Sequence, residues 1–166
     1  MFEKKKSAEG ALYSPLIGKI VSLSEVNDPV FSEEMLGKGF AVIPDSKMLT
    51  LRMPANGRIV SISDTAHAVN LLTDDGLELL IHVGIDTVEL RGNGFELLCS
   101  VGDELPCGAP IMKVDFPELK RHSKDTVTPV VITNSESVTD LSAIIGKCDG
   151  DGCIALKYTK TEVKRL

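Results

Sequence analysis

Residues 67–84 read HAVNLLTDDGLELLIHVG, and this stretch decides both the fold and the candidate chemistry. Two apolar runs flank the turn signal DDG at 74–76, and Asp-Gly between such runs is typical of a tight β-hairpin. A histidine stands at the outer end of each run, His67 in the first and His82 in the second. The segment therefore predicts two antiparallel strands with one imidazole at the open end of each strand.

The faces of the two histidines follow from the length of the turn. Side chains alternate between the faces of a strand, and residues opposite each other across an antiparallel ladder share a face. A two-residue turn at 75–76 makes His67 and His82 diagonal neighbours, with Cβ atoms roughly 7 Å apart. A turn at 74–75 puts them directly opposite, whereas a three-residue loop separates their faces. The two-residue turn is the pattern's preferred one, so the imidazoles are predicted to meet.

The rest of the chain shows the same punctuation of short apolar runs by Gly, Pro, Asn and Asp. Many short strands with close turns favour an all-β fold, an antiparallel β-sandwich or flattened barrel with one or two short helical turns. The helical signals are residues 32–37, with Ser32 as N-cap, and residues 117–124, with Pro117 in the first helical position. Further strands are predicted at 16–23, 39–43, 49–53, 57–62, 110–116, 128–134 and 153–159.

Length and charge limit the class of protein. The 166 residues suffice for one domain with a full core, which we place at 14–160 between a flexible N-terminal tail, 1–13, and a C-terminal tail, 161–166. A formal net charge of −6 argues against a nucleic-acid partner, which requires a basic surface. No apolar run approaches the roughly 18 residues of a membrane span, and no secretory signal is visible. We expect a cytoplasmic protein.

The four cysteines give a weak signal. They are Cys99, Cys107, Cys148 and Cys153, and none forms a CxxC pair. The segment CDGDGC at 148–153 has turn residues between its thiols but no second cysteine pair or histidine beside it, so it predicts no zinc site. In a reducing cytosol we expect four free thiols.

The residues alone leave three interpretations of the histidine pair open. Sequence motifs for nucleotide cradles, zinc proteases and serine hydrolases are absent. The pair could hold a covalent phosphohistidine, form half of a metal site completed by another protein, or be two structural imidazoles. Thr65, two residues before His67, is predicted to share its face, where a hydroxyl can fix the tautomer of the ring.

The segment LLIHVGIDTVELRGNGFE at 79–96 resembles the signature of the glucose-type IIA domain of the bacterial phosphoenolpyruvate:sugar phosphotransferase system. The resemblance extends to EVNDPVFSEEMLGKGFAVIP at 25–44, to the Thr-x-His of 65–67 and to DTVTPVVITN at 125–134, in the family's order. It covers approximately residues 14–145. The resemblance implies an antiparallel β-sandwich with a shallow apolar active-site depression.

The resemblance also implies roles for individual residues. His82 matches the histidine that is phosphorylated on Nε2, and His67 matches the second histidine, which stabilises the phosphoryl group. Thr65 matches the threonine that orients His67. Gly84 matches the glycine whose carbonyl receives the Nδ1 proton of the active histidine. Residues that line the partner-docking surface in the family match Phe40, Ala41, Val42 and Asp86.

The implied partners are the phosphocarrier HPr as phosphoryl donor and a cysteine of a sugar-specific IIB domain as acceptor. Contact with a membrane would occur only through the IIBC partner. No cofactor and no metal are required, although His67 and His82 could form a zinc half-site with a partner. The alternative function is that of a regulatory protein whose unphosphorylated form binds transporters or metabolic enzymes.

Overall fold

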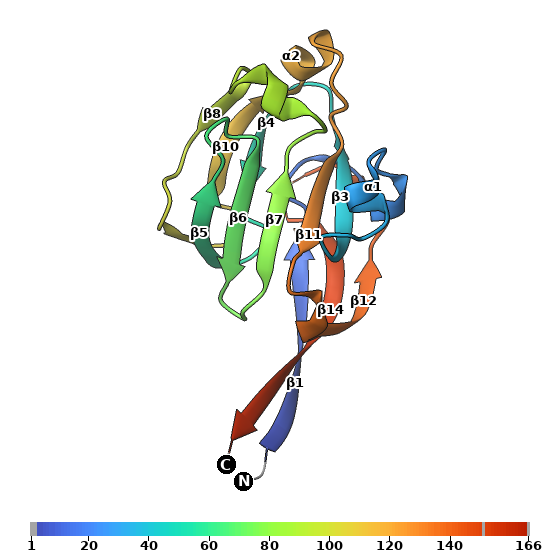
Figure 1. Ribbon diagram of the computed structural model, residues 1–166, viewed down its shortest axis with the longest axis vertical. Coiled ribbons are helices and arrows are strands. Elements are labelled where there is room, and N and C mark those ends of the chain that lie inside the picture. Colours follow the sequence, from blue (N-terminus) through green and yellow to red (C-terminus); the bar gives the residue numbers. More distant parts are fainter. Residues whose placement is uncertain (1–2, 151, 166) are drawn as a thin grey trace.

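The computed structural model describes the backbone of residues 3–150 and 152–165, and the side chains of residues 8–150 and 152–160. Its strands form three sheets, and the strand pairs within them are antiparallel (Figure 1). This confirms the predicted all-β sandwich. The strand bounds are as follows: β1 Glu3–Tyr13, β2 Gly18–Val21, β3 Lys38–Pro44, β4 Met48–Arg52, β5 Gly57–Ile62, β6 Ala68–Thr73, β7 Glu78–His82, β8 Phe95–Leu97, β9 Glu104–Leu105, β10 Pro110–Asp115, β11 Thr128–Ile132, β12 Val138–Ala143, β13 Gly146–Cys148 and β14 Ile154–Arg165.

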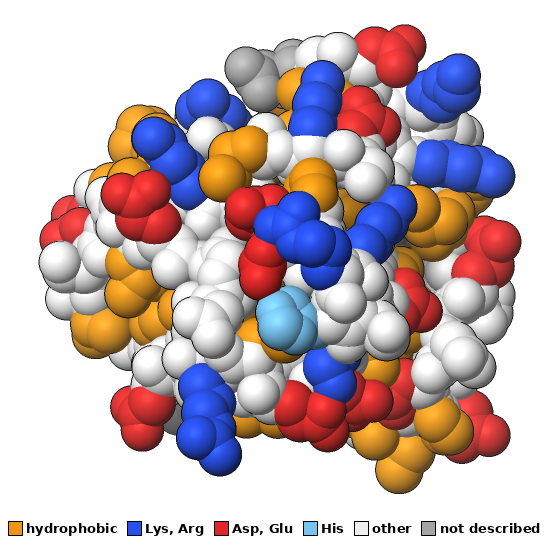
Figure 2. Space-filling view, turned by 90° about the horizontal axis from the view of Figure 1, so that it is seen from above, with side chains coloured by type: hydrophobic (Ala, Val, Ile, Leu, Met, Phe, Trp, Pro, Cys, Tyr) orange, Lys and Arg blue, Asp and Glu red, His pale blue; other side chains and the backbone are white. Residues whose placement is uncertain are grey.

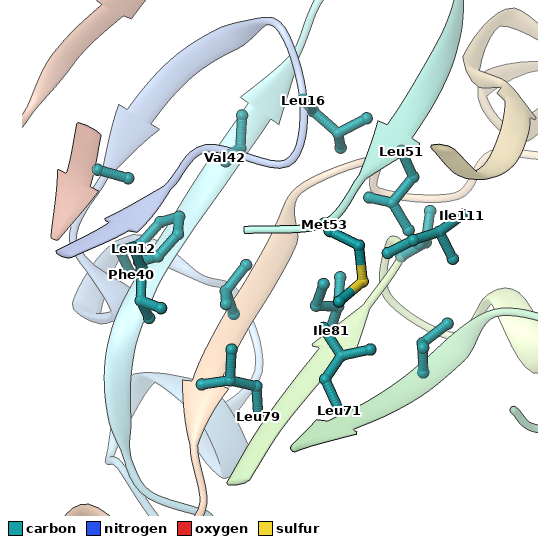
Figure 3. Packing of buried hydrophobic residues seen from close by; sticks show 14 of the residues in the cluster. Leu12, Leu16, Phe40, Val42, Leu51, Met53, Leu71, Leu79, Ile81 and Ile111 are labelled. Atoms are coloured by element: carbon teal, nitrogen blue, oxygen red, sulfur yellow. The ribbon is translucent and has the colours of Figure 1, made fainter. Parts of the chain in front are cut away.

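The largest sheet has the order β13-β2-β3-β11-β7-β6-β5-β9. A three-stranded sheet, β4-β10-β8, lies behind its β5–β7 end, and a second, β1-β14-β12, lies at its β3 end (Figure 1). Apolar side chains from all three sheets share one core, which includes Leu51, Leu79, Ile111 and Leu156. Figure 3 shows several of these side chains pointing into the common interior. The sheets form layers because each has one apolar face to bury.

Strand β7 shows how the sequence pattern produces these layers. Leu79 and Ile81 are fully buried in the main core, whereas Glu78, Leu80 and His82 point to the other face. That outer face is covered in part by a second apolar cluster, to which Phe31, Ala41, Ile85 and other residues contribute. His82 therefore stands on a face that is apolar but only partly covered.

The helices are shorter than predicted, and one of them is displaced. Helix α1 spans Pro29–Ser32 and begins after Asp28, whose carboxylate accepts a hydrogen bond from the Val30 amide at 3.0 Å. The predicted helix at 32–37 is wrong, because Pro29 suits the start of a helix and Glu34 already has a left-handed φ of 56°. Helix α2, Phe116–Arg121, lies close to its predicted position, with Asp115 as N-cap. Three single turns of 3₁₀ helix are η1 Leu23–Glu25, η2 Thr87–Leu90 and η3 Ser135–Ser137.

Both predicted tails carry strands instead. Strand β1 pairs with β14 along its length, from Glu3 opposite Arg165 to Tyr13 opposite Ile154, and this ribbon extends beyond the body of the molecule (Figure 1). Leu12 is fully buried in the core, so the domain begins before residue 14. The pairing joins residues from opposite ends of the chain, and no local pattern announces such a partner.

The cysteines also differ from expectation. Cys148 and Cys153 form a disulfide, whereas Cys99 and Cys107 are free thiols, so the prediction of four free thiols is wrong. The Cα atoms of the two cysteines lie 5.9 Å apart, a usual separation for a disulfide. Among residues 3–150 and 152–165, no helix has the length and apolar character of a membrane span.

Candidate functional site

The loop between β5 and β6 carries His67. The Ser63 amide donates to the Ala68 carbonyl at 2.9 Å, which closes the hairpin around residues 64–67. Within the loop, the Ala66 amide donates back to the Ser63 carbonyl at 2.8 Å, and Ala66 has a left-handed φ of 62°. His67 therefore lies just outside the regular strand β6, and the sharp turn at Ala66 sets its direction.

The hairpin of β6 and β7 brings His82 to the same place, although its register is not the predicted one. Ala68 lies opposite His82 and Leu72 lies opposite Glu78, so the loop has three residues, 74–76. By strand alternation alone this register would separate the two histidines. Their rings nevertheless lie with centroids 5.0 Å apart, because His67 belongs to the preceding loop. The prediction that the imidazoles meet is confirmed, whereas its stated reason, a two-residue turn, is wrong.

Gly84 fixes the orientation of the His82 ring. The Nδ1 atom of His82 lies 2.6 Å from the Gly84 carbonyl oxygen, so Nδ1 carries the hydrogen and donates it. The other nitrogen, Nε2, is then left with a free lone pair. Gly84 has a φ of 73°, and a Cβ there would lie 2.6 Å from Thr87 Cγ2. The position thus requires glycine for both its backbone conformation and its space.

Two hydroxyls approach the Nδ1 atom of His67. Thr65 Oγ1 lies at 2.6 Å, as its predicted role requires, and Ser63 Oγ lies at 3.3 Å. Thr65 reaches the ring from within the hairpin loop, not from a strand face. Sequence reasoning missed Ser63, because a serine four residues before a histidine meets it only if the chain reverses between them.

Burial dominates the electrostatics of the pair. It lowers the pKa of His82 below the ordinary value of 6.5, and the Gly84 hydrogen bond and the carboxylates of Asp28 and Asp86 oppose this only in part. Burial also lowers the pKa of His67, and the proximity of His82 lowers it further. Both rings are therefore neutral at neutral pH, which leaves the His82 Nε2 lone pair free to act as a nucleophile.

The surroundings of His82 are apolar, but they are not the ones predicted. The Phe31 ring of α1 packs against the His82 ring at a centroid distance of 5.4 Å. Phe40, Ala41 and Val42 have no exposed surface, so the prediction that they line a docking surface is wrong. They are central residues of β3 and are covered on both faces of the sheet, Phe40 and Val42 by the main core and Ala41 by the outer cluster.

Other residues on the neighbouring elements are exposed. Val30 of α1 is 37% exposed and Val88 of η2 is 51% exposed. Asp86 has a left-handed φ of 59° at the start of η2, and its charge favours protonated His82. A docking role for Asp86 stays a prediction. Figure 2 views the molecule from the end that carries α2 and shows basic, acidic and apolar side chains interspersed on that surface.

No group of three or more potential metal ligands occurs in the parts of the chain that the structure describes. The histidine pair supplies two nitrogen ligands, and a zinc ion usually takes three or four protein ligands. A zinc half-site completed by a partner thus stays a prediction. The geometry is that of a neutral nucleophilic imidazole with a second imidazole, oriented by hydroxyls, beside it.

The comparisons with known proteins agree with this geometry. Residues 10–138 match the family model described as phosphoenolpyruvate-dependent sugar phosphotransferase system, EIIA 1. The glucose-specific EIIA component of Staphylococcus aureus (strain COL) is 37% identical over 144 residues, which cover 86% of each chain. The glucoside-specific EIICBA component of Staphylococcus carnosus (strain TM300) is 46% identical over 132 residues, or 78% of this chain and 19% of that one.

A solved structure shows the same fold. Glucose permease IIA from Mycoplasma capricolum superposes with a TM-score of 0.82 at 32% identity, covering 90% of this chain and 96% of that one. Fold, family model and relatives of similar length thus agree. The chain belongs to the EIIA 1 family of the phosphoenolpyruvate-dependent sugar phosphotransferase system, and it is a phosphocarrier of that system.

Proposed function

We propose that His82 is the residue that carries the phosphoryl group, accepting it from phosphorylated HPr and passing it to a cysteine of a IIB domain. The observation that carries the proposal is the 2.6 Å contact between His82 Nδ1 and the Gly84 carbonyl, which leaves the Nε2 lone pair free. In the first step this lone pair attacks phosphorus, a bond from Nε2 to phosphorus forms, and the bond from phosphorus to the donor nitrogen breaks. Nδ1 keeps its hydrogen throughout.

His67 stabilises the transferred group. Its ring lies edge to face with that of His82, at a centroid distance of 5.0 Å. When the hydroxyls donate to its Nδ1 atom, the hydrogen of the neutral ring lies on Nε2, from which it can be donated to a phosphoryl oxygen. Positioning and electrostatics dominate phosphoryl transfer, so a fixed donor beside the nucleophile is an effective catalyst.

The apolar surroundings protect the intermediate. Phe31 covers one side of the His82 ring, and a docked partner covers the rest, which keeps water from hydrolysing the phosphoramidate. In the second step the cysteine sulfur of IIB attacks phosphorus and the bond to His82 Nε2 breaks. Since HPr and IIB meet the same partly buried histidine, they dock one after the other. We place this exchange, and the chain with it, in the cytoplasm.

The test is phosphoryl transfer from labelled phosphoenolpyruvate through enzyme I and HPr. We expect an acid-labile, alkali-stable label on the wild type and on His67→Ala, and none on His82→Ala. His67→Ala should pass its label to IIB slowly. His122→Ala is the matched control, because His122 lies on the surface and its Nε2 contacts Glu118. Absence of label from the wild type with a competent donor would exclude the phosphocarrier role of His82.

We also propose a regulatory role for the unphosphorylated form. The neutral histidine pair stands on a face with the exposed apolar side chains Val30 and Val88 nearby, and such a surface suits an apolar partner. Phosphorylation adds between one and two negative charges at its centre and would weaken this binding. Transporters or metabolic enzymes bound by the wild type should therefore be released on phosphorylation, with and without added zinc.

A further inference from the structure

Ser63 lies at a structural junction beside the histidine pair. It follows the last residue of β5, and its side-chain oxygen accepts a hydrogen bond from the Ala68 amide, the first of β6, at 3.1 Å. The same oxygen lies 3.3 Å from His67 Nδ1. One hydroxyl thus contacts both the start of strand β6 and the His67 ring. Ser63 was not among the site residues predicted from the sequence.

The hydrogen of this hydroxyl has a defined destination. The oxygen of Ser63 accepts a hydrogen bond from Ala68 N–H, and its own hydrogen is still available for donation. The nearest partner that the structure gives for it is His67 Nδ1. Thr65 Oγ1 brings a second hydroxyl to the same nitrogen at 2.6 Å. An Nδ1 atom without a hydrogen can accept hydrogen bonds from both hydroxyls. An Nδ1 atom that carries a hydrogen has no lone pair left to accept either one.

We propose that Ser63 is a positioning residue, which acts together with Thr65 to hold neutral His67 in the tautomer with its hydrogen on Nε2. This inference rests on the proposed function, because the Nε2 hydrogen matters only if His67 donates it to a phosphoryl oxygen. The opposite tautomer would point a bare His67 Nε2 lone pair at the negatively charged phosphoryl oxygens. Ser63 acts through His67 and makes no contact with the phosphoryl group itself.

The two hydroxyls contribute differently because their other hydrogen bonds differ. Thr65 sits inside the hairpin loop, and within the described part of the chain its hydroxyl is hydrogen-bonded to His67 alone. Ser63 is tied to the strand by the Ala68 amide, so its hydroxyl cannot turn away without breaking that bond. Thr65 therefore makes the shorter hydrogen bond to His67. Ser63 makes the longer contact, but from an oxygen that is also hydrogen-bonded to the sheet.

The experiment has a spectroscopic arm that needs no phosphoryl donor. The ¹⁵N chemical shifts of the His67 ring report which nitrogen carries the hydrogen in the unphosphorylated protein. We expect Nε2–H in the wild type and a larger Nδ1–H population in Ser63→Ala. Ser63→Thr should restore the wild-type shifts, because it keeps a hydroxyl. Ser61→Ala is the matched control, since Ser61 lies in β5, two residues before Ser63, and its hydroxyl accepts a hydrogen bond from the Asn70 side chain at 2.9 Å.

The kinetic arm measures transfer from phospho-His82 to a IIB domain. Loss of one hydrogen bond of ordinary strength predicts a slowing of about three- to tenfold in Ser63→Ala, with normal rates in Ser63→Thr and Ser61→Ala. Wild-type His67 with its hydrogen on Nδ1 would overturn the inference without any variant. So would a Ser63→Ala protein with wild-type ring shifts and transfer rate. Failure of the phosphocarrier role appears separately, as wild-type protein that takes no label.

Discussion

Gly84 performs two tasks that no other residue type combines. Its left-handed φ of 73° turns its carbonyl toward His82, and the absence of a side chain leaves room for Thr87 and for the Asp125 carbonyl. Thr87 is itself fixed by a hydrogen bond to the Val83 carbonyl at 2.5 Å. The conformation of one glycine thus decides which nitrogen of His82 keeps a free lone pair.

Gly84→Ala should therefore lose both stability and phosphoryl acceptance. A left-handed alanine costs about 1–2 kcal/mol, and the contact of its Cβ with Thr87 Cγ2 adds about 1–3 kcal/mol. Gly102→Ala is the matched control, because Gly102 has a φ of 93° but open space around it. Urea unfolding measures the difference, and equal losses in the two variants would refute the steric argument.

The lowered pKa values of the histidines predict the pH dependence of stability. The unfolded chain binds protons at the ordinary value of 6.5, whereas folded His67 and His82 bind them only at lower pH. The unfolded state therefore holds more protons in this window, and stability falls as the pH drops below about 6.5. Unfolding measured from pH 7.5 to 5 should show this slope, and His82→Gln should reduce it. An unchanged slope in that variant would contradict the assignment.

At the scale of elements, helix α1 is a short helix that packs against the His82 ring and is stabilised by its N-cap residue. Asp28 caps the helix, and the helix presents Phe31 to the His82 ring. The Asp28 charge also raises the pKa of His82. Asp28→Asn should keep the cap and lower that pKa, as seen by NMR titration. Asp28→Ala should lower the pKa equally and cost about 1 kcal/mol of stability in addition. Equal stability of the two variants would argue against the capping role.

The far end of the β6–β7 hairpin is tied to β14. Tyr158 donates its hydroxyl hydrogen to the carboxylate of Asp75, which also accepts from Thr73. Tyr158→Phe should cost about 1 kcal/mol in urea unfolding and leave phosphoryl acceptance unchanged, because His82 pairs with Ala68 at the other end of the hairpin. Tyr13→Phe is the control, since no side-chain hydrogen bond of Tyr13 occurs among the residues that the structure describes. A loss of acceptance in Tyr158→Phe would mean that the turn also positions His82.

The elements show which features a single sequence can predict. The central strands could be found because alternation such as that of Leu79, Leu80 and Ile81 is a local signal. The exact loop length at 74–76 could not, since two- and three-residue turns both accept Asp-Gly. The predicted contact of the two imidazoles was nevertheless correct, because the chain reversal at Ala66 sets the direction of His67. The role of the Gly84 carbonyl came from family resemblance alone, whereas a hydroxyl contact of Thr65 with the His67 ring was also predicted from spacing.

At the scale of the whole molecule, the sheet order joins segments far apart in sequence. Strand β11 lies between β3 and β7, and β14 pairs with β1. Such pairings depend on which edges remain open after the local hairpins form, and a single sequence carries no direct record of that. The same limit explains Phe40, Ala41 and Val42, which the resemblance assigned to a surface. Their strand β3 has neighbours on both sides and an apolar layer on each face.

The ribbon of β1 and β14 supplies the sharpest test at this scale. If residues 1–13 were a tail, Leu12→Ala would change stability little. In the structure Leu12 is fully buried in the core, so the substitution should cost about 2–5 kcal/mol. Ile145→Ala is the control, because Ile145 is 54% exposed, and it should cost less than about 0.5 kcal/mol. Urea unfolding compares the two variants. A small effect of Leu12→Ala would support the sequence-based prediction that residues 1–13 are a flexible tail. A large effect would mean that the two ends of the chain close one core, on which the histidine-bearing sheet rests.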